Sequence, residues 1–167
     1  MALVYPSFDA ALLTPAHGLA SLASDTNLLA GRQSEVIDCM GGIYEDFLLY
    51  AKTMTGTSPT TGRSIEYWLI GSVDGTLWPD TVTGAGDAAR TLTATIIKNA
   101  ICVPMQVLET NSTSNQPYHT RVWSARSLFG ELPAKFVVWS THNTVAALNA
   151  TSANHALYVE PVKRNIN

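Results

Sequence analysis

Residues 136–160, FVVWSTHNTVAALNATSANHALYVE, decide between two interpretations of this chain. The stretch is either a polar site that does chemistry or a set of strands joined by polar turns. Residues 135–140 and 155–162 alternate with the period-two pattern of β-strands, and the short apolar run 145–148 between them predicts a third strand. The Asn and Ser residues around this run suit turns because their side chains bond to their own backbone. The stretch therefore predicts a strand–turn–strand–turn–strand meander.

His142 and His155 are the residues of this stretch that could carry chemistry. They are 13 positions apart with no cysteine or paired carboxylate nearby, whereas zinc ligands come in closer pairs. A general base also needs a nucleophile and an orienting group; Ser140 is close, but the chain has no Gly-x-Ser-x-Gly elbow. We expect no metal site, no cofactor and no catalytic residue, and so no enzyme. We expect the histidines to bond to backbone or water at the ends of loops.

The rest of the chain repeats the pattern of short strands separated by turn residues. The further strands predicted are residues 34–40, 44–55, 64–73, 90–98, 100–109 and 118–127. Trp68, Leu69 and Ile70 are apolar in succession, which predicts a central strand covered on both faces. Pro104 places its strand at an edge or a bulge. With almost no helical periodicity, this pattern predicts an all-β fold, a single jelly-roll or Greek-key β-sandwich.

Composition limits the classes of function. The chain has 167 residues, which suits one domain, and 14% of them are charged, below the usual ~25%. The net charge is −3 and no basic run exceeds Lys163-Arg164, so we expect no nucleic-acid binding. There is no apolar stretch of about 20 residues, so we expect no membrane span. Cys39 and Cys102 could form one disulfide, but no export signal is visible, which favours reduced, packed thiols.

The N-terminal region differs from the rest. Residues 1–30 contain two prolines and many small residues, and Pro15 cuts short the one possible helical turn. We interpret this segment as an extended arm that precedes a β-sandwich domain of residues 31–167. Its apolar anchors are Val4, Tyr5, Phe8, Leu12 and Leu13. The arm either lies on a neighbouring subunit or forms a first strand and loop on its own domain. In the sandwich, Trp78 beside Pro79 is a candidate for a stacking or interface role.

Three segments carry a resemblance to a known class of protein. VDGTLWPD (73–80), residues 91–107 and above all SLFGELPAKFVVWSTHNTVAALNATSANHALYVEPV (127–162) resemble small tailed-bacteriophage virion proteins of the capsid decoration or minor capsid type. The resemblance extends over about residues 25–162. It implies a structural β-sandwich protein on a capsid, with no catalytic residues to carry over.

The resemblance implies partners and a location. The partner would be the major capsid protein, and the protein would be a homo-oligomer, most plausibly a trimer at three-fold positions of the shell. Its place would be the virion, assembled in the cytoplasm of the host bacterium. The rival hypothesis is a carbohydrate-binding β-sandwich module of a phage tail or adsorption apparatus. That module would need a groove, for which the chain can supply Trp78, Asn115, Tyr118 and His119.

Overall fold

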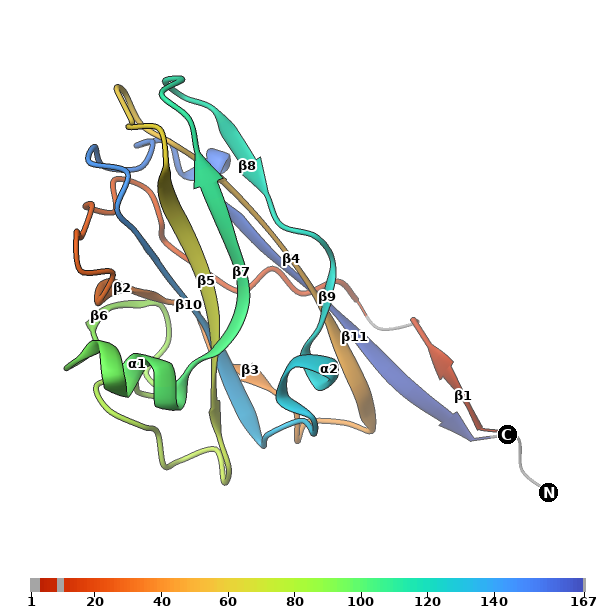
Figure 1. The fold of residues 1–167 in the computed structure, drawn as a ribbon. Helices are drawn as coiled ribbons and strands as arrows, with labels where there is room; N and C mark the ends of the chain where they lie inside the picture. The colour runs from red at the N-terminus through yellow and green to blue at the C-terminus, as the bar shows by residue number, and fades with distance from the viewer. Residues whose placement is uncertain (1–3, 9–10, 167) are drawn as a thin grey trace.

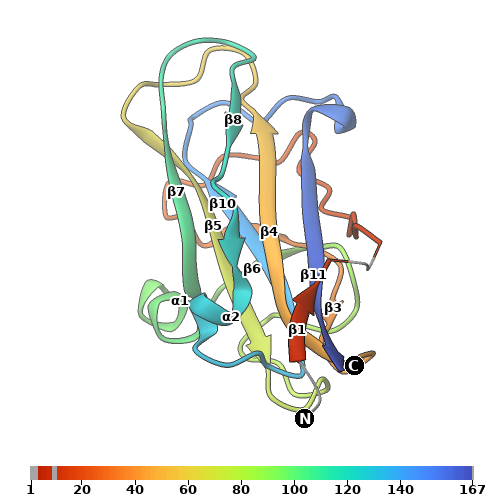
Figure 2. The same cartoon turned by 90° about the vertical axis from the view of Figure 1, so that its right-hand side faces the viewer.

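The structure, a computed structural model, describes residues 4–8 and 11–166. In these residues two antiparallel sheets pack as an all-β sandwich (Figures 1 and 2), so the predicted fold class is confirmed. Sheet A contains β1 (Val4–Ser7), β4 (Tyr44–Met54), β8 (Pro117–His119), β9 (Trp123–Ser124) and β11 (Ala156–Ile166). Sheet B contains β2 (Ala30–Gln33), β3 (Ile37–Asp38), β5 (Arg63–Ser72), β6 (Ala88–Thr91), β7 (Val103–Thr110) and β10 (Lys135–His142). The helices are α1 (Thr95–Ile101), α2 (Ala125–Phe129) and the 3₁₀-helix η1 (Ser152–Asn154).

Strand order shows that the chain repeatedly changes sheet. In sheet A the order is β1-β11-β4-β8, with β9 also on β4, and in sheet B it is β6-β2-β10-β5-β7, with β3 also on β10. Consecutive β10 and β11 lie in different sheets, so the predicted meander is wrong. The residues between them cross the sandwich instead. The predicted strand at residues 145–148 is also wrong, because only Leu148 pairs there, in a single bridge to Thr55.

The buried residues of the two core clusters confirm the predicted alternation of side chains between the two faces of the long strands. The inward residues of β4, β5, β10 and β11 form one buried cluster between the sheets: Phe47, Leu49, Ala51, Ile65, Tyr67, Leu69, Phe136, Val138, Leu157 and Val159. Their neighbours Ile70, Val137 and Trp139 face the other side of sheet B and pack in a second cluster with Val82, Leu92 and Cys102. Strand β5, between β10 and β7, is therefore covered on both faces, as its apolar run predicts.

Pro104 lies where the sequence places it. Strand β7 is at the edge of sheet B, and its pairing with β5 is irregular between Tyr67 and Trp68, opposite Gln106 and Pro104. A proline has no N–H for a ladder, so it is tolerated at such an edge irregularity.

Two predicted strands contain helices instead. Residues 90–98 are strand only through Thr91, and α1 follows; its Lys98 is buried, with Nζ 3.0 Å from Glu66 Oε2 and 3.2 Å from the carbonyl oxygen of Leu28. The β-branched residues of this region imitate a strand pattern, but tertiary contacts decide the conformation. Residues 118–127 contain the end of β8, the whole of β9 and the start of α2. Ser124 caps α2, because its side chain accepts the N–H of Ser127.

Described residues of the N-terminal segment contact the sandwich of the same chain. Strand β1 pairs with β11 of the same chain, and Leu13 exchanges backbone hydrogen bonds with Val159. Leu19 is 2% exposed and belongs to the core between the sheets. Of the two alternatives, a first strand and loop on its own domain describes residues 4–8 and 11–29. None of the helices described here could cross a membrane.

Candidate functional site

One end of the sandwich, which we call the basal end, gathers the features that suit contact with a partner. It carries the loops 39–43 and 73–77, helix α2 and a terminal ribbon made of β1 and residues 163–166 of β11 (Figures 1 and 2). The pairing of β11 with β4 ends at Lys163 and Tyr44. Residues 164–166 therefore pair only with β1 and extend the ribbon beyond the body of sheet A, as Figure 1 shows.

Large apolar side chains are exposed on the two basal loops. Met40, Ile43, Val73 and Leu77 are 58%, 66%, 89% and 74% exposed. The loops meet each other: a Cβ on Gly75 would come within 3.1 Å of Met40 Cε, and Gly75 has φ +79°. The two loops therefore lie against each other at Met40 and Gly75.

The second loop holds its shape through Asp74. Its Oδ1 accepts the N–H groups of Leu77 and Thr76 at 2.7 and 2.8 Å, which lowers the pKa of this carboxyl to about 2. An aspartate that bonds the backbone of the following residues is a standard way of fixing a turn. Leu77 and Val73 are therefore presented on an ordered loop.

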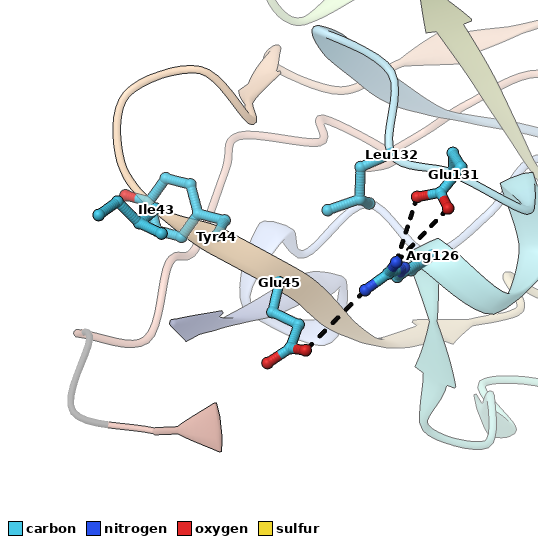
Figure 3. A pocket seen from close by; sticks show the side chains of 6 residues that line it. All are labelled: Ile43, Tyr44, Glu45, Arg126, Glu131 and Leu132. Atoms are coloured by element: carbon cyan, nitrogen blue, oxygen red, sulfur yellow. Dashed lines mark hydrogen bonds and ion pairs between the residues drawn. The ribbon is translucent and has the colours of Figure 1, made fainter. Parts of the chain in front are cut away.

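A hollow of about 410 Å³ lies beside these loops (Figure 3). Its lining residues are Ile43, Tyr44, Glu45, Arg126, Glu131 and Leu132. Arg126 of α2 reaches both carboxylates: its Nη2 is 3.3 Å from Glu131 Oε2 and its Nη1 is 4.0 Å from Glu45 Oε1. These side chains are partly or largely exposed, so the pairs contribute little to stability. They remain available to reorganise around a partner.

A second hollow of about 350 Å³ shares Glu45 and Arg126 with the first. Its remaining lining residues are Pro6, Phe8, Asp46, Leu48 and Val162. Phe8 is 59% exposed and stands where the terminal ribbon joins the sheet. The two hollows combine apolar side chains with three carboxylates and one guanidinium.

The structure brings only some of the predicted contact residues to this surface. Phe8 lines it. Leu12 and Leu13 are exposed, and the backbone of Leu13 is bonded to β11. The side chains of Val4 and Tyr5 lie outside the described part of the chain. Trp78 is half-buried and packs against the second core cluster.

Sequence reasoning missed Met40, Ile43, Val73, Leu77 and Arg126. The signal that could have found the first four is a large apolar residue inside or beside a turn segment rich in Gly and Asp. Ile43 and Leu77 stand outside the predicted strands, and Met40 and Val73 are the last residues of two of them, so these side chains are free to face solvent.

The four residues proposed for a glycan groove are not brought together. Trp78 packs against the cluster on the outer side of sheet B, whereas Tyr118 packs against the cluster between the sheets. Asn115 Oδ1 accepts a hydrogen bond from the side chain of Asn149 in the loop before η1. His119 lies on the outer face of sheet A, where it contacts Tyr50. These placements do not form the expected groove.

The histidines of the opening stretch have structural partners. His142 bonds through Nε2 to the carbonyl of Leu22 and through Nδ1 to Thr144 Oγ1, both at 3.0 Å. His155 bonds to the carbonyl of Asn149 at 2.8 Å and to Thr53 Oγ1 at 2.6 Å. Burial lowers the pKa of both side chains. The predicted backbone partners are confirmed, and among residues 4–8 and 11–166 no group of His, Cys, Asp or Glu could hold a metal ion.

The cysteines are both free and lie in different places. Cys39 packs against the cluster between the sheets and Cys102 belongs to the second cluster. Burial raises the pKa of each thiol to about 12. Both thiols are therefore protonated at neutral pH and are weak nucleophiles.

Comparison of the chain with protein-family models, with curated protein sequences and with solved structures finds no match.

Proposed function

We propose that this chain is a structural virion protein of a tailed phage, which binds the outside of the capsid shell through its basal end and stabilises the shell as a decoration protein. The observation that carries the proposal is the exposure of four large apolar side chains on two adjoining loops at the basal end. The contact would be with the major capsid protein.

The energetics of the basal end favour a protein contact. Full burial of a Val, Leu, Ile or Met side chain is worth about 1.5–3 kcal/mol, and association costs several kcal/mol before any gain appears. Burial of Met40, Ile43, Val73 and Leu77 together would supply at most about 6–12 kcal/mol, which is comparable with that cost, whereas one such residue supplies too little. Strand β1 is the edge strand of sheet A, a position from which a sheet can accept a further strand from a partner.

We also infer a jelly-roll topology for the sandwich. With the short strands β3, β6 and β9 set aside, the order β1-β11-β4-β8 faces β2-β10-β5-β7. Apart from the step from β5 to β7, each step along these eight strands changes sheet. Double-sheet jelly rolls of eight strands recur in viral capsid and lectin domains. This topology agrees with the resemblance of residues 127–162 to tailed-phage virion proteins.

Binding would stabilise the shell by linkage. A ligand that binds only the assembled shell lowers the free energy of that state by RT ln(1 + [L]/Kd). A trimer at three-fold positions would combine three weak basal contacts into one stronger attachment. The low charged fraction of the chain, 14%, suits a surface that works by contact.

Co-sedimentation tests the proposal. Purified protein is mixed with phage heads that lack it, the heads are pelleted, and bound copies per particle are counted. Light scattering gives the mass, and so the oligomeric state, of the free protein. We expect saturable binding with copy numbers that match symmetry positions of the shell. A protein that stays in the supernatant at all concentrations would contradict the proposal.

Matched variants then locate the contact. The double variant Ile43→Ser, Leu77→Ser removes exposed apolar surface from the basal end, and Ile96→Ser removes it from α1, where Ile96 is 77% exposed. We expect the double variant to lose binding to heads and Ile96→Ser to retain it. Equal binding by both would assign the contact to another face.

A further inference from the structure

The outer face of sheet A carries an aromatic row across three neighbouring strands. Tyr158 of β11 lies opposite Tyr50 of β4, and His119 of β8 lies beside Tyr50. The ring centroids are 5.9 Å apart for Tyr158 and Tyr50 and 6.0 Å apart for Tyr50 and His119. The neighbours of Tyr50 in β4, Leu49 and Ala51, are fully buried between the sheets, so the row faces away from the core.

The rings of Tyr50 and His119 form one continuous surface. Tyr50 Oη is 2.6 Å from His119 Nδ1, and the ring planes differ by 22°. Rings stacked face to face would lie about 3.5 Å apart, farther than these two bonded atoms. The two rings are therefore tilted by a small angle, offset from each other and joined by this hydrogen bond. The hydrogen bond holds this arrangement before any ligand arrives.

The polar side chains around the row balance each other in charge. Lys52 lies opposite His119 on one side and Ala156 on the other, and its Nζ donates to the carbonyl of Ala153 at 3.1 Å. Glu160 follows Tyr158 on the same face, two positions along β11. One cation and one anion beside the row do not select an anionic ligand. A nucleic acid would also stack on the rings, but its phosphates need a cationic groove.

We propose that the row Tyr158–Tyr50–His119 binds a neutral saccharide. A pyranose ring has a C–H face that packs on an aromatic face and hydroxyl groups at its rim, which suits a flat aromatic surface flanked by a donor and an acceptor. The sugar ring lies on the exposed side of Tyr50 and His119, and its hydroxyls reach Lys52 and Glu160. This site is separate from the basal end and does not rest on the proposed capsid role.

The test uses the intact protein with three defined probes, maltohexaose, cellohexaose and chitohexaose, followed by NMR of the aromatic side chains. We expect at least one probe to shift the resonances of Tyr50 and Tyr158 in a saturable way. Tyr158→Ala weakens that binding about tenfold or more because it removes a ring from the row. Tyr44→Ala, a half-buried tyrosine in the basal hollow, changes it by less than about twofold.

Tyr50→Phe keeps the aromatic ring at position 50 and removes its hydrogen bond to His119. Circular dichroism establishes that each variant is folded. We expect Tyr50→Phe to weaken binding because His119 is no longer held against residue 50 by the hydrogen bond. Absence of binding to all three probes overturns the proposal, as does binding that Tyr158→Ala leaves unchanged.

Two further measurements identify another occupant of this face. Self-association in sedimentation velocity that Tyr158→Ala abolishes would assign the row to contact between copies. Loss of binding to heads by Tyr158→Ala, without sugar binding in the parent protein, would assign it to the shell. Either result overturns the saccharide site, whereas failure of the Ile43→Ser, Leu77→Ser experiment bears only on the proposed function.

Discussion

Thr53 and His155 are joined inside the sandwich by a hydrogen bond of 2.6 Å between Thr53 Oγ1 and the Nδ1 atom of the histidine. The bond ties the C-terminal end of β4 to the residue that precedes β11. His155 also holds the carbonyl of Asn149, so it fixes the end of the connection that crosses between the sheets. A second buried histidine, His17, meets the ring of Tyr67 edge to face at 6.4 Å. Neutral histidines are thus part of the packing.

Stability should fall in mild acid. Burial lowers the pKa of His17 from 6.5 to about 4, and it lowers the pKa of His142 and His155. Because the folded-state pKa is the lower one, protons bind preferentially to the unfolded chain. The contribution of the neutral histidines to the free energy of unfolding is present above pH 6.5 and is lost as the pH falls toward their folded-state pKa. For His17 the loss is about 3 kcal/mol at pH 4.

Urea unfolding at several values between pH 7.5 and pH 4 measures this loss. His17→Gln should flatten the profile in that range because the titrating group is gone. An unchanged slope in His17→Gln would contradict the assignment.

Lys98→Met should be strongly destabilising. Lys98 and Glu66 form an ion pair of 3.0 Å with side chains only 7% and 11% exposed, and the ammonium lies 4.9 Å from the ring centroid of Trp68. The substitution leaves a buried carboxylate without its cation, which costs about 3–5 kcal/mol in free energy of unfolding. Lys135→Met breaks the more exposed pair with Asp38 and should cost less than about 1 kcal/mol. Similar losses in the two variants would refute this explanation.

Gly31→Ala should disturb the second core cluster. A Cβ at Gly31 would lie 2.7 Å from Trp139 Cζ2 and would touch the carbonyl oxygen of Ser140. Overpacking of this kind costs about 1–3 kcal/mol. Gly41→Ala is the matched control, because a Cβ there meets nothing within 4 Å, and it should change stability by less than about 0.5 kcal/mol. Thermal unfolding of both variants checks the difference.

Deletion of residues 1–8 should separate folding from binding. Among the described residues, strand β1 pairs with β11 alone, over four residue pairs. We expect a folded protein with Tm lowered by less than about 5 °C and with reduced binding to heads. An unfolded deletion variant would show that the ribbon is part of the stable fold. Undiminished binding would remove the ribbon from the contact.

The long strands could be predicted from the sequence, because burial on one face imposes alternation on the residues themselves. Phe47 and Leu49 of β4 share one face at period two, and this face and that of Phe136 of β10 point into the cluster between the sheets. The helices could not be predicted in the same way. The segment that becomes α1 is short and β-branched, and its conformation depends on the pairing of Lys98 with Glu66, which is 32 positions away.

The candidate sites were less accessible to sequence reasoning. Phe8 was named for its apolar side chain and lines the basal surface, but Ile43 and Leu77 in turns were not recognised as part of it. The aromatic row depends on the register between β11, β4 and β8. Tyr50 and Tyr158 are 108 positions apart, and no local pattern relates them.

The sequence by itself determined that the chain forms short strands with defined inward faces, that β5 is covered on both sides and that Pro104 marks an edge, because each of these follows from side-chain chemistry at neighbouring positions. Only the tertiary structure decided which strands pair, that β10 and β11 belong to different sheets and that residues 11–29 pack on their own domain. Pairing between distant strands is chosen by the packing of the whole core, and the exposed basal end and the aromatic row exist only once that choice is made.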